Sequence, residues 1–159
     1  MRNFLKLLAF SFISLCFVSL QAVAGEKGIT ITFANSERSV EVSDAQIADL
    51  PQVAFETTTP WDAVARRFEG PTLKSVLEAA NAEVSNLTLV ALNDYKIQIP
   101  AEHIKENWPI VARLRDGAAM SVRDKGPYWV LFPFDSDKEL QNELYYSFSI
   151  WQMAKIIVE

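Results

Sequence analysis

A run of charged side chains directly in front of an apolar segment marks the most promising place for chemistry in this sequence. Residues 128–134 read YWVLFPF, and three ionised residues, Arg123, Asp124 and Lys125, precede them across a Gly126-Pro127 turn. A turn that holds charges at the mouth of a buried strand can place a polar site on a rigid frame. The sequence therefore predicts a binding site at this turn.

The chain offers little chemistry for a metal or for a thiol nucleophile. It contains one cysteine, Cys16, and one histidine, His103. Cys16 lies in a segment that we expect to be removed, which would leave the mature protein without a thiolate. His103 follows a predicted helix start at Pro100 and is expected to face solvent, and a lone histidine lacks the further ligands that a zinc site needs. We therefore expect no metal and no Cys chemistry.

The first 24 residues have the three-part pattern of a secretory signal peptide. Arg2 and Lys6 give a positive start, residues 7–20 are apolar apart from three serines, and Ala22-Val23-Ala24 is an A-x-A cleavage site. We predict that residues 1–24 are cleaved, that the protein is exported to the periplasm, and that it is not stably inserted in the membrane afterwards. The alternative is a single membrane anchor, since the apolar run is nearly long enough to span a bilayer.

Length and charge restrict the partners of the mature chain. Cleavage would remove two positive charges and no negative charge, leaving 135 residues and changing the net charge from −5 to −7. That length fits one domain, residues 25–159, with one core. Nucleic acid needs a basic face, and anionic lipid also attracts basic segments. We therefore expect neither as a partner.

The elements that would position these residues are strands with short helices between them. Strands are expected at residues 29–33, 39–42, 53–58, 87–92, 95–99, 110–114, 128–134 and 148–158. Helices are expected at residues 44–50 behind a Ser43 cap, from Pro71 in a first turn to Ala80, and after Pro100. This mixture favours a single α+β domain with a mixed, barrel-like β-sheet and short inserted helices.

Four motifs, taken in this order, resemble the sulfite-oxidase-type molybdopterin-binding domain. Residues 68–80 (FEGPTLKSVLEAA) are similar to its Gly-x-x-Leu helix start, and residues 91–100 (ALNDYKIQIP) to its Asp/Gly-Tyr strand followed by Ile-Pro. Residues 116–133 are similar to its last Gly-Pro strand, and residues 149–157 to its closing strand. The likeness covers residues 50–158 and implies the fold together with a pterin pocket.

The chain departs from that family where the metal ligand would lie. The resemblance implies a molybdenum-binding Cys upstream of the Gly-x-x-Leu helix start, but residues 56–62 read ETTTPWD. A threonine hydroxyl is a poor ligand for a soft, high-valent metal site compared with a thiolate. The resemblance therefore does not carry over the oxidoreductase activity.

A subset of small exported proteins with this fold is more similar still. The shared features are Thr-Pro-Trp at 59–61, Leu-Asn-Asp-Tyr at 92–95, Met-x-Val-Arg-x-Lys-Gly-Pro at 120–127 and Trp-Gln at 151–152. In that subset the fold is a non-catalytic periplasmic pterin-binding module that reports pterin status to an inner-membrane enzyme of cyclic di-GMP metabolism. The resemblance implies the same role here, with the periplasmic domain of such a signalling enzyme as the partner.

A pterin makes chemical demands that can be compared with the residues of this chain. Its 2-amino-4-oxo edge has two adjacent donors, which one carboxylate can accept together, and its ring faces suit aromatic or guanidinium planes. Asp94 and Asp124 are the expected carboxylates. Trp61, Phe68 and Tyr95 are expected to stack on the ring. The residues expected to contact carbonyl or tail oxygens are Arg66, Arg67, Arg123 and Lys125, and Asn93 is the expected tail-binding amide.

Several of these residues also have an explanation without a ligand. Asp94 follows Asn93 in a turn that both residue types favour. Residues 123–125 could be an exposed charged turn, which adds little to stability. Trp61 could be a core residue at the edge of a loop. Trp129 and Trp151 lie within apolar stretches and are expected in the core, since tryptophan is mostly buried.

Three classes of function remain open from the sequence. The first is a non-catalytic protein that binds a reduced pterin or a molybdopterin-like ligand. The second is a molybdenum-cofactor-dependent oxidoreductase whose metal site lacks Cys. The third is an exported protein-interaction module with a vestigial pocket.

Overall fold

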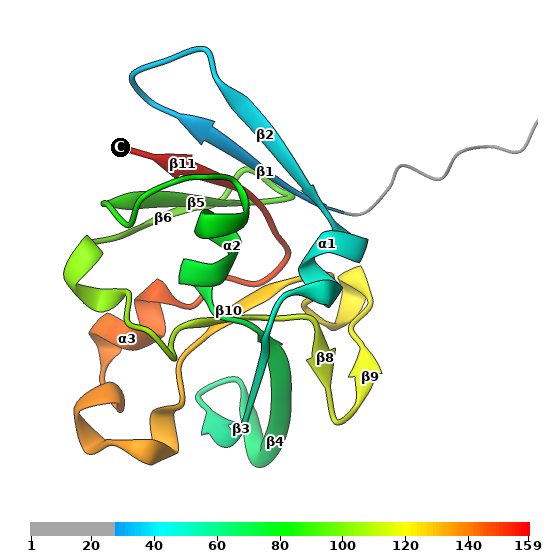
Figure 1. The fold of residues 1–159 in the computed structure, drawn as a ribbon. Helices are drawn as coiled ribbons and strands as arrows, with labels where there is room; N and C mark the ends of the chain where they lie inside the picture. Colours follow the sequence, from blue (N-terminus) through cyan, green and yellow to red (C-terminus); the bar gives the residue numbers. More distant parts are fainter. Residues whose placement is uncertain (1–27) are drawn as a thin grey trace, which may run out of the picture.

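The largest sheet joins the two ends of the described chain, residues 28–159 of this computed structural model. Its strands, in the order in which they pair, are β2 (Ser39–Ser43), β1 (Gly28–Phe33), β11 (Met153–Val158), β5 (Leu87–Ala91) and β6 (Lys96–Ile99). Strands β1 and β11 run parallel and the other neighbours antiparallel, so the sheet is mixed (Figure 1). The predicted signal peptide and its cleavage site lie outside the described residues.

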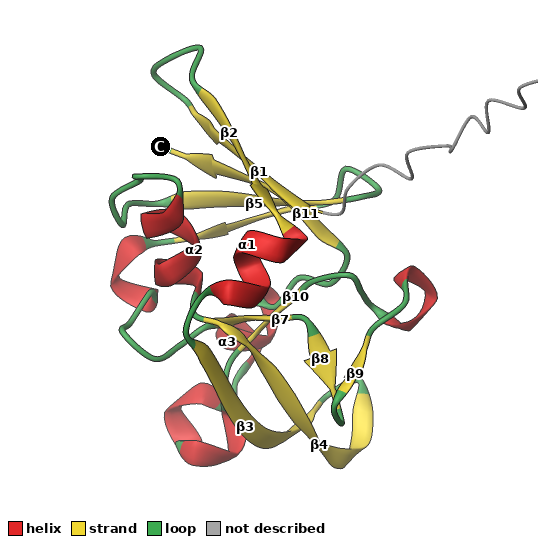
Figure 2. Cartoon of the chain, turned by 45° about the vertical axis from the view of Figure 1, so that its right-hand side comes forward, coloured by secondary structure: helices red, strands yellow, loops and turns green. Residues whose placement is uncertain are grey.

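A second sheet lies at the opposite end of the molecule (Figure 1). Its antiparallel strands are β3 (Gln52–Thr59), β4 (Asp62–Pro71), β8 (Leu114–Arg115) and β9 (Ala118–Ala119). A two-stranded sheet of β7 (Ile110–Ala112) and β10 (Trp129–Leu131) lies between the two larger sheets (Figure 2). These middle strands pair only with each other, and the expected barrel-like closure is not formed among the described residues.

Three short α-helices connect the strands of the described chain, and each begins with a side-chain cap. Helix α1 (Asp44–Asp49) has a capping box of Ser43 and Gln46, as the sequence predicts in part. Helix α2 (Leu73–Ala79) is capped by Thr72, and α3 (Glu143–Phe148) by Asn142. The expectation that Pro71 lies in the first turn of α2 is wrong, because Pro71 is the last residue of β4.

Single turns of 3-10 helix complete the connections. They are η1 (Ala101–His103), η2 (Val122–Asp124), η3 (Phe134–Ser136) and η4 (Lys138–Leu140). No helix within residues 28–159 has the length and apolar character needed to cross a bilayer. The α+β class, the mixed sheet and the short inserted helices agree with the sequence prediction.

The core fills the space between the sheets and α2 with aliphatic and aromatic side chains. Its largest fully buried members come from β4 and from the apolar segment at 128–134: Phe68, Tyr128, Trp129, Phe132 and Phe134. Gly70 on β4 is required for this packing, because a Cβ there would lie 1.9 Å from the Val111 carbonyl oxygen of β7. The core thereby fixes the β3–β4 hairpin and the segment after β10, which both reach the site described next.

Candidate ligand pocket

A cavity of about 510 Å³ opens where segments from distant parts of the sequence meet. These segments are the β3–β4 hairpin tip, the β5–β6 turn, helix α3 and the link from α3 to β11. The lining residues are Pro60, Trp61, Ala91, Asn93, Tyr95, Glu143, Tyr146, Ser147, Ser149, Ile150 and Trp151. The predicted site residues Trp61, Asn93 and Tyr95 therefore all line the same cavity.

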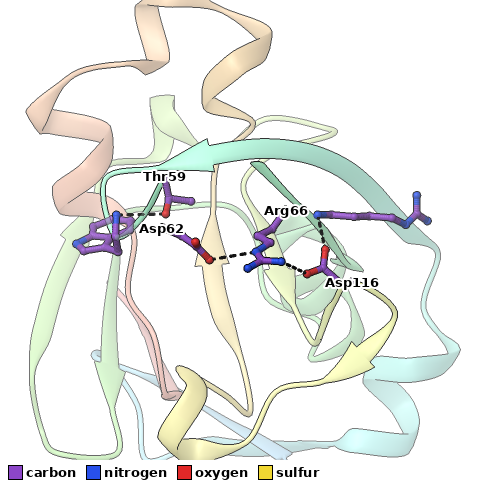
Figure 3. Close-up of polar contacts among 6 residues, drawn as sticks. Thr59, Asp62, Arg66 and Asp116 are labelled. Atoms are coloured by element: carbon purple, nitrogen blue, oxygen red, sulfur yellow. Dashed lines mark hydrogen bonds and ion pairs between the residues drawn. The ribbon is translucent and has the colours of Figure 1, made fainter. Parts of the chain in front are cut away.

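Aromatic rings make up much of the pocket surface. The centroid of Trp61 lies 5.5 Å from that of Trp151 and 6.4 Å from that of Tyr146, with interplanar angles of 78° and 76°. Trp61 sits at the hairpin tip, where its backbone N–H donates to the Thr59 hydroxyl at 3.3 Å (Figure 3). The nearly perpendicular rings form an open corner, which can receive a flat ligand against one face and edge-on to the other.

One residue, Gln152, ties the two predicted turns to this corner. Its backbone oxygen accepts from Leu92 N–H at 2.9 Å, and its backbone N–H donates to the Lys125 oxygen at 3.0 Å. Its side-chain amide donates to the Val122 oxygen at 2.7 Å. These bonds hold Trp151 between the turns with 37% of its surface exposed. The prediction that Trp151 lies in the core is wrong, whereas the same prediction is confirmed for Trp129.

Helix α3 supplies a wall that the sequence analysis missed. Asn142 caps it, with its side-chain oxygen accepting from Leu144 N–H at 2.9 Å and Tyr145 N–H at 3.3 Å. The sequence pattern predicts a strand from Phe148 onward and indicates no element at residues 143–147, whereas the structure has α3 at Glu143–Phe148. The signal that could have identified the helix is Asn142 followed by an acidic first-turn residue, Glu143.

The β5–β6 turn places Asn93 and Tyr95 at the pocket and leaves Asp94 outside its lining. The Asn93 side chain accepts from Tyr95 N–H at 3.2 Å, and Asp94 N–H donates to the Ala91 oxygen at 3.0 Å. Asp94 has a φ of 64°, a conformation that Asp and Asn tolerate better than most residues. Turn formation accounts for Asp94 without a ligand.

The charged turn at 123–125 lies beside the pocket rather than in its lining. Asp124 accepts from the Ser121 hydroxyl at 2.6 Å and closes turn η2, while Arg123 is exposed. The Lys125 ammonium lies 5.4 Å from the Trp129 ring centroid and 5.8 Å from that of Trp151. This cation–π contact supports Trp151 from outside the cavity.

The two predicted arginines of β4 belong to an ion-pair network on the second sheet, outside the pocket lining. Arg66 contacts Asp62 at 3.4 Å and Asp116 at 3.2 Å, and the Arg67 backbone N–H donates to Asp116 at 3.1 Å (Figure 3). The Arg67 guanidinium pairs with Glu69 at 2.9 Å. This network joins β4 to the turn between β8 and β9.

Phe68 has no surface open to a ligand. Its side chain is fully buried, and its ring meets the Trp129 ring edge-to-face at a centroid distance of 5.4 Å. The expectation that Phe68 stacks on a ligand is therefore wrong. The cause is that Phe68 lies within β4, paired with Phe55 of β3, and its ring faces the core.

The lining of the pocket is acidic. Glu143 is the one ionisable carboxylate among its lining residues, which include neither Lys nor Arg. A neighbouring cavity of about 260 Å³ shares Pro60 and Tyr146 with it and contains Asp135. That carboxylate accepts from the Thr58 N–H at 2.6 Å and hydroxyl at 2.8 Å. A ligand that fills both cavities would meet two acidic side chains.

The residues present do not fit a molybdenum cofactor. Molybdopterin carries a phosphate, for which the pocket lining offers no cation, and residues 28–159 contain no Cys to supply a thiolate. Within this described range no three His, Cys, Asp or Glu side chains are grouped so that they could hold a metal ion. In the threonine stretch, Thr57 is fully buried and its hydroxyl accepts from Asp135 N–H at 3.1 Å.

His103 lies away from the pocket, on the other side of α3. It is half-buried, with Nδ1 at 3.3 Å from the Tyr145 hydroxyl and its ring 5.0 Å from that of Phe148. The expectation that His103 faces solvent is therefore wrong. It packs against α3, an element that the sequence analysis did not identify.

Comparison with solved structures supports the fold. The chain is similar to the sulfane dehydrogenase SoxCD from Paracoccus pantotrophus, known from a crystal structure, with a TM-score of 0.56 and 11% sequence identity. The match covers 83% of this chain and 38% of that one, so this chain spans well under half of the dehydrogenase chain. No protein-family model and no curated protein matches the sequence. At this identity the likeness supports a shared fold and nothing finer.

Proposed function

We propose that the protein is an exported, non-catalytic pterin-binding protein, and that its ligand is a pterin without a phosphate group. The observation that carries this proposal is the aromatic corner of Trp61, Trp151 and Tyr146 in a 510 Å³ cavity. Cavities of about 300–1,000 Å³ that combine aromatic walls with a few polar groups are the usual sites of small ligands. A pterin ring matches both the flat walls and the polar groups.

The alternative of a molybdenum-dependent oxidoreductase has less support. The acidic lining disfavours the phosphate of molybdopterin, and no thiolate is present in residues 28–159 to hold the metal. The sequence resemblance and the fold similarity agree with a family of redox enzymes, but neither supplies the missing ligand. We expect purified protein to contain far less than one equivalent of molybdenum and to oxidise no sulfite. Molybdenum near one equivalent per chain would overturn the non-catalytic function.

The exposed apolar residues favour a protein partner near the pocket mouth. Tyr95 and Trp151 line the pocket and are 59% and 37% exposed, and Leu92 and Val122, both exposed, are tied to the same wall through Gln152. Exposed apolar surface around a ligand site is typical of an interaction surface. We propose that this rim contacts the periplasmic domain of an inner-membrane cyclic di-GMP enzyme, as the sequence resemblance implies.

Calorimetric titration tests the ligand assignment. A tetrahydropterin with an uncharged dihydroxypropyl tail would be compared with a reduced pterin whose tail carries a phosphate. We expect the uncharged pterin to bind at least tenfold more tightly, because the phosphate would lie near carboxylates in a pocket without a cation. Equal or tighter binding of the phosphorylated pterin would contradict the ligand class. Absence of binding by either would remove the pterin function itself.

A further inference from the structure

One carboxylate of the pocket lining, the exposed Glu143, makes no polar side-chain contact with the rest of the described chain. Glu143 is the first residue of α3 and lines the cavity beside Tyr146 and Ser147. Within residues 28–159 its carboxylate accepts no hydrogen bond and forms no ion pair, whereas Asp124 closes a turn and Asp135 binds Thr58. The cap of α3 is provided by Asn142, so Glu143 supports the helix only as an acidic residue in its first turn.

The donor edge of a pterin requires such a group. The ring N3–H and the 2-amino group point in the same direction and can both donate to one carboxylate, in the manner of a bidentate ion pair. The other polar lining groups are amide, hydroxyl and backbone groups, which cannot offer two charged acceptor oxygens. We infer that Glu143 is the specificity-determining residue that binds the 2-amino-4-oxo edge of the ligand, an inference that rests on the proposed pterin function.

This assignment replaces Asp94 and Asp124, the carboxylates that the sequence favoured for that edge. Neither lines the cavity, although the turns that carry them flank Trp151. Glu143 faces the same cavity as Trp61 and Trp151, so a ring lying against one indole can direct its donor edge toward the α3 wall. Glu143 thereby gives the ring an orientation that the aromatic faces alone do not select.

The inference predicts discrimination between two closely related rings. In a lumazine, a carbonyl replaces the 2-amino group, so its edge presents one donor and one acceptor. A carboxylate then faces a carbonyl oxygen, and one of its hydrogen bonds is lost. The side chain of Glu143→Gln carries one donor and one acceptor, which complements the lumazine edge instead. The substitution should therefore reverse the ligand preference rather than only weaken binding.

The test measures affinities for a pterin and a lumazine that carry the same uncharged tail. The wild-type protein should prefer the pterin by about ten- to a hundredfold, the range expected for a charged hydrogen bond. Glu143→Gln should lower the pterin affinity by a similar factor and bind the lumazine at least as tightly as the pterin. Asp94→Asn is the matched control, because it removes the same charge near the pocket and should keep the wild-type preference.

Each remaining outcome is decisive. If Glu143→Gln is folded by circular dichroism and keeps the wild-type preference, Glu143 does not bind the donor edge, while the pterin function stands. If Asp94→Asn loses the preference as fully as Glu143→Gln, a general effect of charge explains the result and the inference is wrong. If the wild-type protein binds neither ring, the proposed function fails together with the inference. Glu143→Ala, which also leaves the Asn142 cap in place, serves as a second variant and should lose pterin affinity without gaining lumazine affinity.

Discussion

Trp129 and Trp151 show that two tryptophans in similar apolar stretches can differ in burial, one lying in the core and the other at the surface. Both occur in apolar stretches, yet Trp129 is 1% exposed and Trp151 is 37% exposed. Trp129 begins β10, where both faces are covered. Trp151 precedes Gln152, whose φ of 54° turns the chain before β11 begins. Sequence pattern alone could not separate them, because the turn depends on two backbone hydrogen bonds of Gln152, one accepted from Leu92 N–H and one donated to the Lys125 oxygen.

Replacing Trp151 should affect ligand binding much more than folding. Trp151→Ala removes one face of the aromatic corner, and an aromatic contact contributes about 0.5–1.5 kcal/mol beyond the area that it buries. We expect pterin binding about tenfold weaker by calorimetry, with a small change in the unfolding midpoint. Val64→Ala, at a site with 59% exposure on β4, is the control and should bind as the wild type does. Unchanged affinity in Trp151→Ala would place the ligand elsewhere.

The buried hydroxyl of Tyr128 should make stability depend on alkaline pH. Burial and the hydrogen bond that it donates to Asp44 at 2.7 Å raise the pKa of Tyr128 above its usual range. In the unfolded chain a tyrosine hydroxyl has a pKa of about 10. Below that pH both states hold the proton; above it the unfolded state releases the proton first, and stability falls as pH rises.

Comparison with Tyr128→Phe isolates this effect. The variant should lose about 1 kcal/mol at pH 8, because the hydrogen bond to Asp44 is gone. Between pH 10 and 11 the wild type should lose up to about 1.4 kcal/mol that the variant does not lose. The difference in free energy of unfolding, measured with urea, should therefore shrink or reverse by pH 11. Parallel pH profiles would show that the Tyr128 proton is not retained in the folded state.

Among the elements, those with local signals could be predicted and those defined by tertiary contacts could not. The β1–β2 hairpin, α1 with its Ser43 cap and the β5–β6 hairpin follow from alternation, capping and turn residues in the sequence. Strand β4 has no alternation, since it reads DAVARRFEGP, and it forms through pairing with β3 and β8. The aromatic residues of α3 resemble those of a strand.

These misses determined how much of the site could be predicted. Trp61, Asn93 and Tyr95 were found because they lie in turns with recognisable sequences. Glu143 and Tyr146 were missed because they belong to α3, whose position depends on packing across the cavity. Phe68 was expected to stack on the ligand because strand β4, which buries it, has no strand pattern in the sequence. Turn residues of the pocket could therefore be predicted from sequence. The cap of α3 also has a local signal, but the place of this helix in the pocket wall depends on tertiary packing.

The N-cap of α3 should control the shape of the pocket. Asn142→Ala removes the acceptor for two backbone N–H groups and should destabilise the helix by about 1 kcal/mol. Because a six-residue helix has little stability of its own, the wall with Glu143 and Tyr146 should loosen and ligand binding should weaken by severalfold. Asn142→Ser, which keeps an N-cap acceptor, should restore most of both. Equal binding by all three proteins would show that α3 is held by packing alone.

At the scale of the whole molecule, the pocket forms only when the complete fold is assembled. Its walls come from the second sheet, from the β5–β6 turn of the main sheet, and from residues 143–151, which precede the closing strand β11. The sequence resemblance predicted this type of fold, and the likeness to the sulfane dehydrogenase agrees with it at 11% identity. The composition of the pocket depends on which loop and helix residues this frame brings together.

This organisation predicts how a ligand should stabilise the protein. A ligand that binds only the folded state at a concentration of 100 times its Kd adds about 2.7 kcal/mol to the free energy of unfolding. Amide hydrogen exchange should slow most at residues 61, 91–95 and 143–151, which bound ligand would hold together. The β1–β2 turn at residues 34–38 lies outside the pocket lining and is the internal control. Its amide exchange rates should fall only for those amides that exchange through global unfolding. Protection confined to residues 121–125 instead would place the ligand at the charged turn, as the sequence first suggested, and not in the aromatic cavity.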